Sequence, residues 1–315
     1  MNRIDVIFPY VDCRKEKWQS DWEKATGRVY YNNEDKQRYY ADGELLRYKL
    51  RATERYMPWV RKVFIIVHDK TQVPEWMNAE TVTVVEHKEF IPKEYLPTFN
   101  SCAIEMFVHL IKDLSEYYIY SNDDFIPNGA LKPDDFFYQD YDGSIKAKNK
   151  LEIINIGSHK QRKEHYFQIA RNSYEFAKKH YPNRCFRELG ETEYPQVPHI
   201  SAPMIKSFCN SVYERFKDEV LSSVSSFREY KNFNQYMFSF CAMGADVCKT
   251  DYKYRHRYCA TTKKDLPMIV KVLINEKYRE TVLNDNSKTD FSIYPVIYDV
   301  LGKKFPIRSK YELQG

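Results

Sequence analysis

Residues 117–124 read Tyr-Tyr-Ile-Tyr-Ser-Asn-Asp-Asp, an apolar and aromatic run that ends in an amide and two carboxylates. The run predicts a buried strand over Tyr117–Ser121. In open α/β sheets, ligands gather at the carboxyl ends of strands, where Asn122, Asp123 and Asp124 would lie. Two adjacent carboxylates at such a tip suit Mg²⁺ on a nucleotide diphosphate. An Asx-type turn, in which the same side chains bond to the local backbone, is the alternative.

The chain on either side of this strand alternates strands with helices. In the first half we expect strands at Ile4–Val11, Val63–Val67 and Thr81–Glu86, and helices at Gly43–Met57 and Ser101–Leu114. The second half is more helical, with helices at Lys160–His180, Pro203–Phe216, Lys231–Phe240 and Tyr294–Leu301, and strands at Tyr252–Cys259 and Arg279–Leu283. The alternation predicts an α/β fold with a largely parallel sheet. No shift in composition marks a boundary, so we expect a single domain over residues 1–315 with a helical insertion around 139–197.

The composition narrows the class of protein. The 315 residues include 49 Lys and Arg against 44 Asp and Glu, which gives a net charge of +5. Positive and negative residues are mixed along the chain, which argues against a nucleic-acid-binding arm. The seven Cys are odd in number and dispersed, which indicates reduced thiols and not a disulfide framework or a zinc site. No stretch approaches the roughly 18 apolar residues of a membrane span. We expect a cytoplasmic protein that binds no nucleic acid, and a peripheral position at the inner face of the membrane stays open.

Further acidic residues flank or follow predicted strands. Asp5 and Asp12 flank the first strand, with Asp12 at its carboxyl end, and Asp285 lies in an Asn-Asp-Asn tip after the strand Arg279–Leu283. Each of these residues alone is more often a turn residue. Tips on neighbouring strands would converge on one centre, as an active site requires.

Three arginines are the main cationic candidates. Arg38 precedes the first long helix, and Arg47 and Arg51 lie one turn apart within it, a spacing at which like charges repel. Glu44 and Glu54 could offset that repulsion as neighbours on the helix. The functional alternative is a clamp on a diphosphate, to which guanidinium groups are well suited.

Of the eight histidines, His199 has the most constrained surroundings. Pro198 and Pro203 bracket it, and a helix is predicted just after it. A histidine with an ordinary pKa is the usual general base near neutral pH, although most histidines have structural roles only. Arg228 is a candidate for stabilising negative charge.

The order of these motifs resembles the Stealth family of sugar-1-phosphate transferases, which has four conserved regions. The first is similar to residues 4–12, and the second, the longest, includes Arg38, Asp42, Glu44–Tyr48, Arg51, Pro58–Val60, Tyr95–Asn100, His109 and Asn122–Asp124. The third is similar in Pro198-His199, Phe227-Arg228 and Asn234-Gln235, and the fourth in Leu283–Asn286 and Phe305–Glu312. Tyr10 and Cys13 depart from the first region's usual Trp and Gly, and Asn232 stands where the family commonly has Asp.

The resemblance implies a fold and a reaction. The fold would be a nucleotide-sugar-binding sheet similar to the GT-A class of glycosyltransferases, forming one catalytic domain. A glycan hydroxyl would attack the sugar-linked phosphorus of a UDP-hexose or UDP-N-acetylhexosamine, releasing UMP and forming a phosphodiester in capsular or exopolysaccharide synthesis. Mg²⁺ or Mn²⁺ would assist, and whether the acceptor glycan is lipid-linked stays open. The competing readings are a metal-dependent GT-A glycosyltransferase that releases UDP, and a non-catalytic glycan-binding protein.

The resemblance also implies roles for individual residues. Asp123, Asp124 and Asp285 would hold the metal. His199 would be the base, with Asp12 as the alternative, and Arg228 would stabilise the phosphate. The donor would be bound by Asp5, Arg38, Asp42, Arg47, Arg51, Asn100 and Asn122.

Overall fold

The computed structural model of the chain describes residues 3–30, 43–156, 165–250, 254–286 and 288–314. Two residues expected to bind the donor, Arg38 and Asp42, lie outside these ranges. The predicted helix start at Lys160 and the predicted strand start at Tyr252 also lie outside them.

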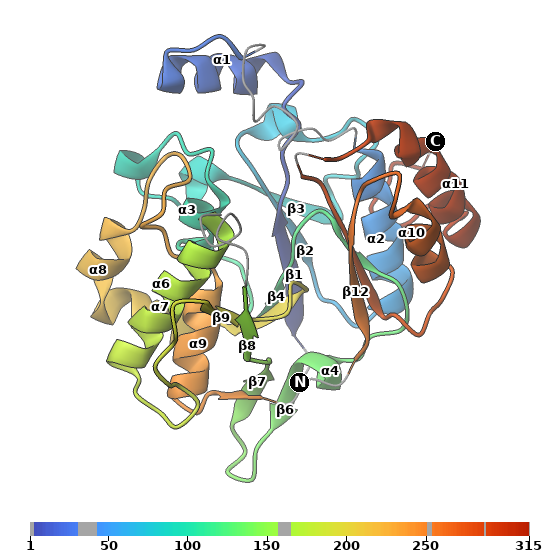
Figure 1. Cartoon of the computed structure of the whole chain (residues 1–315). Coiled ribbons are helices and arrows are strands. Elements are labelled where there is room, and N and C mark those ends of the chain that lie inside the picture. Colours follow the sequence, from blue (N-terminus) through green and yellow to red (C-terminus); the bar gives the residue numbers. More distant parts are fainter. Residues whose placement is uncertain (1–2, 31–42, 157–164, 251–253, 287, 315) are drawn as a thin grey trace.

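A five-stranded sheet forms the centre of the molecule (Figure 1). Its strands run in the order β10 (Ala202–Ile205), β4 (Tyr117–Tyr120), β1 (Ile4–Pro9), β2 (Val63–Val67) and β3 (Val82–Glu86). The four strands from the first half of the chain are parallel, and β10 pairs with β4 in the antiparallel sense. Parallel strands are usually covered on both faces, which explains why β1 and β2 are almost continuously apolar and buried. The predicted α/β fold with a largely parallel sheet is confirmed.

Helices lie on two sides of this sheet, as Figure 1 shows. One group is α2 (Glu44–Tyr56), α10 (Leu266–Leu273) and α11 (Tyr294–Lys304), and the other is α6 (His165–His180), α7 (Lys206–Arg215), α8 (Lys217–Ser222) and α9 (Tyr236–Gly244). Within the first group α11 packs against both α2 and α10, and within the second α9 packs against α6 and α7. The short helices are α3 (Ser101–Glu105) and α4 (Pro133–Phe136), and single 3-10 turns occur at Lys70–Gln72, His87–Glu89, Lys93–Tyr95, Val108–Leu110 and Phe291–Ile293.

Smaller sheets attach to this framework. A three-stranded sheet has the order β12 (His256–Ala260), β13 (Glu280–Asn284) and β5 (Phe125–Pro127), another has the order β11 (Cys248–Lys249), β7 (Ile145–Lys148) and β6 (Phe137–Gln139), and β8 (Glu152–Asn155) pairs with β9 (Glu193–Gln196). In the first of them, Val282 of β13 lies opposite Phe125, and the Leu283 amide donates to the Asp124 carbonyl at 3.0 Å. This pairing brings the end of β13 to residues Asn122–Asp124, which follow β4 and are called the acidic tip below.

Several predicted elements differ from the structure, among them the helix expected over Lys231–Phe240, which is α9 at Tyr236–Gly244. The helix expected over Ser101–Leu114 is a short helix, α3, and a separate 3-10 turn. The helix expected to begin at Pro203 begins at Lys206, because the apolar residues before it form β10 instead. The span 139–197, predicted as a helical insertion, contains one long helix, α6, together with strands β7, β8 and β9.

Helix α1 (Glu16–Thr26) lies over the carboxyl edge of the main sheet (Figure 1). It ends at Gly27, whose left-handed φ of 67° suits a residue without Cβ. Trp18 packs edge-on against Tyr30 and Phe99, with ring centroids 5.5 and 5.3 Å apart, and Trp22 packs against Tyr30 at 5.5 Å. This aromatic cluster fixes α1 to the sheet edge, since rings packed in this way bury large apolar areas.

All seven cysteines are free, and six of them are buried, in agreement with the predicted reduced thiols. Among the described residues, no helix combines the length and the apolar character needed to cross a membrane.

Candidate active site

A cleft of about 1190 Å³ opens at the carboxyl edge of the main sheet. Residues from the ends of β1, β4 and β13 line it, together with residues from β8, α6, β12 and the loop before β10. The predicted site residues that it brings together are Asn122, Asp123, Asp124, His199, Arg228 and Asp285. Segments far apart in the sequence therefore converge where the strand-end rule places a ligand site.

A buried lysine holds the acidic tip from below. The side chain of Lys49, on α2, is 1% exposed, and its ammonium donates to Ser121 Oγ at 2.9 Å and to the carbonyls of Asn122 and Phe125 at 2.8 and 2.6 Å. Burial lowers the pKa of Lys49 to about 8, although Glu280, Asp124 and Asp123 act in the opposite sense. The sequence analysis missed this residue. The sequence indicates the burial of Lys49 only through its spacing, because Lys49 falls on the same helical stripe as the buried residues Leu46, Leu50 and Thr53.

Burial makes ionisation of the two carboxyls of the tip unfavourable, and the charge of Lys49 offsets this only in part. Burial raises the pKa of Asp123 to about 6, with the charge of Lys49 acting against the rise. Burial also raises the pKa of Asp124 well above its usual range, and the negative charge of Asp123 adds to the effect. A carboxylate pair whose ionisation is this unfavourable fits a site that is completed by a divalent cation.

Asp285 is the third acidic residue of this group. Its Oδ1 accepts from the Tyr294 hydroxyl at 2.7 Å and from the Thr261 hydroxyl, so the carboxylate is held in place after β13. Its negative charge also raises the pKa of Asp123 and of Asp124. Asp123, Asp124 and Asp285 thus line one cleft with carboxylate oxygens of the kind that Mg²⁺ and Mn²⁺ prefer, although they are not among the described groups whose ligand atoms already lie within 4.8 Å of one another.

His199 lies beside this tip because of the β10–β4 pairing. Ala202 of β10 lies opposite Tyr120, the Ser201 hydroxyl donates to Ser121 Oγ at 3.1 Å, and the His199 ring meets the Phe125 ring edge-on at 4.8 Å. Burial, together with the charge of His256, lowers the pKa of His199 to about 4. The imidazole is therefore neutral at neutral pH and can accept a proton.

The hydrogen bonds of His199 favour one tautomer. Its Nδ1 lies 3.1 Å from the Tyr236 hydroxyl, which in turn donates to Tyr166. We assign the ring proton to Nδ1, because the Tyr236 oxygen then accepts it while donating its own hydrogen onward. The lone pair is left on Nε2, as a general base requires.

Arg228 reaches the cleft from a loop that Asn100 holds. Its guanidinium donates to Ser101 Oγ at 2.9 Å. Asn100 caps α3 and donates through Nδ2 to Asn232 Oδ1 at 3.0 Å and to the carbonyls of Ser225 and Phe227, both at 3.1 Å. Asn100 is 1% exposed and does not line the cleft, so its predicted donor-binding role is corrected to positioning the Arg228 loop.

The structure also corrects the donor-binding role expected of Asp5. This residue is fully buried near the amino end of β1, away from the cleft. Its carboxylate pairs with the Arg61 guanidinium at 2.8 and 2.5 Å and accepts from the Ser115 amide at 2.8 Å. Its partners are thus structural, and parallel strands put their amino ends on the opposite edge from the site.

Arg47 and Arg51 are likewise engaged in structural contacts. The Arg51 guanidinium makes two bonds of 2.7 Å to Glu312 and a third to the Phe305 carbonyl at 2.9 Å. Arg47 pairs with Glu44 at 3.1 Å, as the alternative reading of the sequence anticipated, and neither arginine lines the cleft. They tie α2 to the segment after α11 instead of clamping a diphosphate.

Asp12 is at the carboxyl end of β1 as predicted, but it does not line the cleft. Both of its oxygens accept from the Arg14 guanidinium, at 2.7 and 2.8 Å. Asp12 is a weaker candidate for the base than His199, because the Arg14 guanidinium occupies both of its oxygens and it does not line the cleft.

Glu105 is a cleft residue that the sequence analysis did not single out. Its carboxyl accepts from the Tyr120 hydroxyl at 3.2 Å and from the Gln235 amide at 2.8 Å. Burial raises its pKa to about 7, against the effect of these hydrogen bonds. Its position could not be predicted from the sequence, because Glu105 is the last residue of the short helix α3 and reaches the cleft only through the tertiary fold.

The chain matches a known family model and is similar in sequence to several known proteins. The model of Stealth protein conserved region 2 matches residues 38–145, which include Lys49 and the acidic tip. A capsular polysaccharide phosphotransferase of Haemophilus influenzae is 32% identical over 238 residues, which are 73% of this chain and 61% of that protein. A capsular polysaccharide phosphotransferase of Streptococcus pneumoniae is 27% identical over 340 residues, 99% of each chain. A crystal structure of the galactosyltransferase LgtC aligns over 98% of both chains with 8% identity and a TM-score of 0.37, too low a similarity to argue from.

Proposed function

Since this chain belongs to the Stealth family, we propose that it transfers a sugar-1-phosphate from a UDP-sugar to a glycan hydroxyl, releasing UMP, in capsular or exopolysaccharide synthesis. The observation that carries the proposal is the under-neutralised pair Asp123 and Asp124 in the cleft, with neutral His199 beside it. A glycan-binding protein needs no general base. The same groups suit a negatively charged donor and a hydroxyl nucleophile.

The roles of the residues follow from their positions. A bound Mg²⁺ or Mn²⁺, held by Asp123, Asp124 and Asp285, would supply positive charge to the diphosphate. His199 Nε2 takes the proton of the acceptor hydroxyl as its oxygen bonds to the sugar-linked phosphorus. The bond from that phosphorus to the bridging oxygen breaks, and UMP leaves with the electron pair. Arg228 adds charge near the phosphate oxygens, on which negative charge resides in the transition state.

The leaving group separates this reaction from ordinary glycosyl transfer. Incubation with a UDP-hexose or UDP-N-acetylhexosamine labelled at the sugar-linked phosphorus, Mg²⁺ and a capsular glycan should release UMP and leave the label in the glycan. The label would resist phosphomonoesterase, because a diester has no free phosphate. Release of UDP with an unlabelled glycan would establish a glycosyltransferase instead, and the absence of turnover with every donor would favour a binding protein.

Activity should depend jointly on pH and on the Mg²⁺ concentration. Protons and the cation compete for Asp123, whose pKa is raised to about 6, and for Asp124, whose pKa is also raised, so kcat/KM at limiting Mg²⁺ should fall as the pH drops toward and below about 6. Tenfold more Mg²⁺ should move the midpoint of this fall to lower pH by up to about one unit. Rate profiles at two Mg²⁺ concentrations measure the shift. A midpoint that does not move would mean that these carboxyls do not bind the cation.

A further inference from the structure

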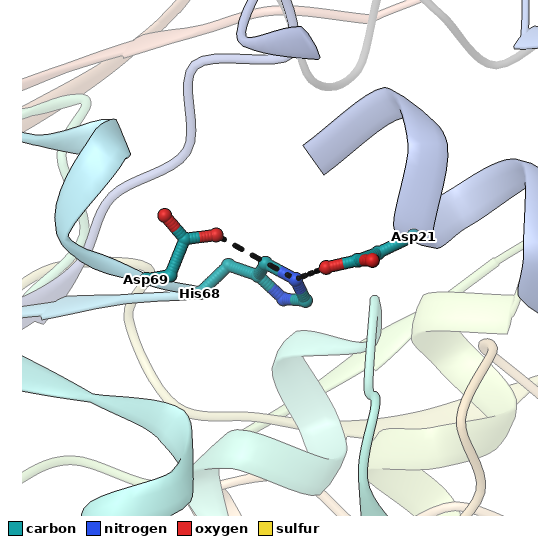
Figure 2. Close-up of side chains that lie close together, drawn as sticks. All are labelled: Asp21, His68 and Asp69. Carbon is teal, nitrogen blue, oxygen red and sulfur yellow. Dashed lines mark hydrogen bonds and ion pairs between the residues drawn. The ribbon is translucent and has the colours of Figure 1, made fainter. Parts of the chain in front are cut away.

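A second group of metal-ligating side chains lies at the end of β2, beneath α1. Figure 2 shows the imidazole of His68 between the carboxylates of Asp21, on α1, and Asp69. His68 Nε2 is 2.9 Å from Asp21 Oδ2 and 3.9 Å from Asp69 Oδ2, and one ligand atom from each residue lies within 4.8 Å of the others. The aromatic contacts that dock α1 bring Asp21 to this place from a distant part of the sequence.

Asp69 presents an oxygen to this cluster that no hydrogen bond uses. The residue is 8% exposed, and its Oδ1 accepts from the Thr71 amide at 2.8 Å and from the Thr71 hydroxyl at 2.5 Å. Its Oδ2 has no hydrogen-bond partner among the described residues. A buried carboxylate oxygen is costly to leave without a hydrogen bond, and the nearest charged groups that the structure describes, Lys17 Nζ at 3.7 Å and His68 Nε2 at 3.9 Å, are too distant to donate one, so this orientation points to a cation as its ligand.

A lysine now shares the space between the two carboxylates. The Lys17 ammonium lies 2.7 Å from Asp21 Oδ2 and 3.7 Å from Asp69 Oδ2. Its side chain is 53% exposed, so it can turn away into solvent at little cost. Lys17 therefore marks where a positive charge is favoured and acts as a competitor for any ion that binds.

We propose that Asp21, His68 and Asp69 bind a divalent transition metal, with Zn²⁺ as the best fit and Mn²⁺ as the next. One imidazole nitrogen with two carboxylate oxygens favours these ions over Mg²⁺ and Ca²⁺, which prefer oxygen alone. Two ligand atoms about 2.1 Å from one ion lie about 3.4 Å apart in tetrahedral geometry. The separations of 2.9 and 3.9 Å therefore need only small side-chain adjustments.

The ion would link α1 to the sheet and face the cleft. His68 lines the cleft, so coordination positions not filled by the protein would open toward it. This site uses none of the residues assigned to Mg²⁺, and its existence does not depend on the proposed function.

Calorimetric titration with Zn²⁺ in a large excess of Mg²⁺ tests the proposal, because Mg²⁺ then occupies the all-carboxylate site. The wild-type chain should bind one Zn²⁺, and Zn²⁺ should raise its thermal midpoint by mass action. D21N should weaken binding by about 100-fold or more, because it removes one of three ligands and replaces a charged oxygen by an amide. K17M should strengthen binding, because the competing ammonium is lost.

A matched control comes from the far side of the molecule. His180 Nε2 lies 2.7 Å from Glu219, which Lys179 also contacts at 3.1 Å, but within the described part of the chain no third metal-ligating side chain joins this pair. H180Q should therefore leave Zn²⁺ affinity unchanged. H68Q should weaken binding at least as much as D21N does. D21N decides the matter if H68Q folds poorly, since Asp21 sits on the partly exposed face of α1. Absence of Zn²⁺ binding, or binding that survives D21N and is lost in D285N, would overturn the proposal.

Discussion

Replacement of Asp124 by asparagine is expected to lower the turnover of UDP-sugar by about 10³-fold or more. The amide keeps the shape of the side chain but removes the negative charge that would hold the cation. D123N should behave in the same way, because the two carboxyls form one site. Initial rates of UMP release at saturating Mg²⁺ measure the loss.

The same replacement should not destabilise the fold. Burial raises the pKa of Asp124 well above its usual range, so the ionised carboxylate opposes folding at neutral pH, and an amide removes that opposition. The backbone contact that orders the tip, from the Leu283 amide to the Asp124 carbonyl, is retained. The thermal midpoint should therefore stay the same or rise. D299N, on the exposed face of α11, is the control and should change neither quantity. Near-normal turnover of D124N would refute its role in cation binding.

Replacement of His199 by alanine is expected to lower turnover by about 10²–10⁴-fold, the range for loss of a general base. The KM for the UDP-sugar should change little, because the acidic tip and Arg228 are untouched. Y236F should cost less than H199A, since it removes only the oxygen that accepts from Nδ1 at 3.1 Å and fixes the tautomer.

A pH profile distinguishes this base role from a structural one. The pKa of His199 is lowered to about 4, so protonation of the free base should not limit kcat/KM above about pH 5. Y236F should not raise the pH at which activity is lost, because removing an acceptor from Nδ1–H destabilises the protonated imidazole more than the neutral one. Full turnover in H199A with an unchanged profile would assign the base to another group of the cleft, such as Glu105.

The elements that could be predicted from the sequence are those set by local patterns. Strands β1, β2 and β4 are short, buried apolar runs, and the turn after β4 carries its polar residues next to the strand. The acidic tip and its place at a carboxyl edge follow from that alone. The helix α2 was also predictable, because its apolar residues repeat at the helical period.

What could not be predicted depends on partners far away in the chain. The residues of β10 are too few to show a period, and they become a strand only because β4 offers an edge. His199 reaches the acidic tip through that pairing. The sequence offered Glu54 or a phosphate as the partner of Arg51, whereas the actual partner, Glu312, lies 261 residues further on. Asp5 was assigned to the site for the same reason, since nothing local indicates its bond to Arg61.

The pairing of β13 with β5 has a consequence for how the protein is made. A ribosome delivers the acidic tip long before residues 280–285, yet the tip is complete only when β13 has docked and Asp285 has arrived. Glu280 also belongs to the late segment, and its carboxylate accepts from the Ser201 amide at 2.7 Å in the loop that carries His199. A nascent chain that ends before residue 280 therefore holds the tip and the histidine without the strand that aligns them. The arrangement of the proposed site is therefore complete only after residues 280–285 have been synthesised and β13 has docked.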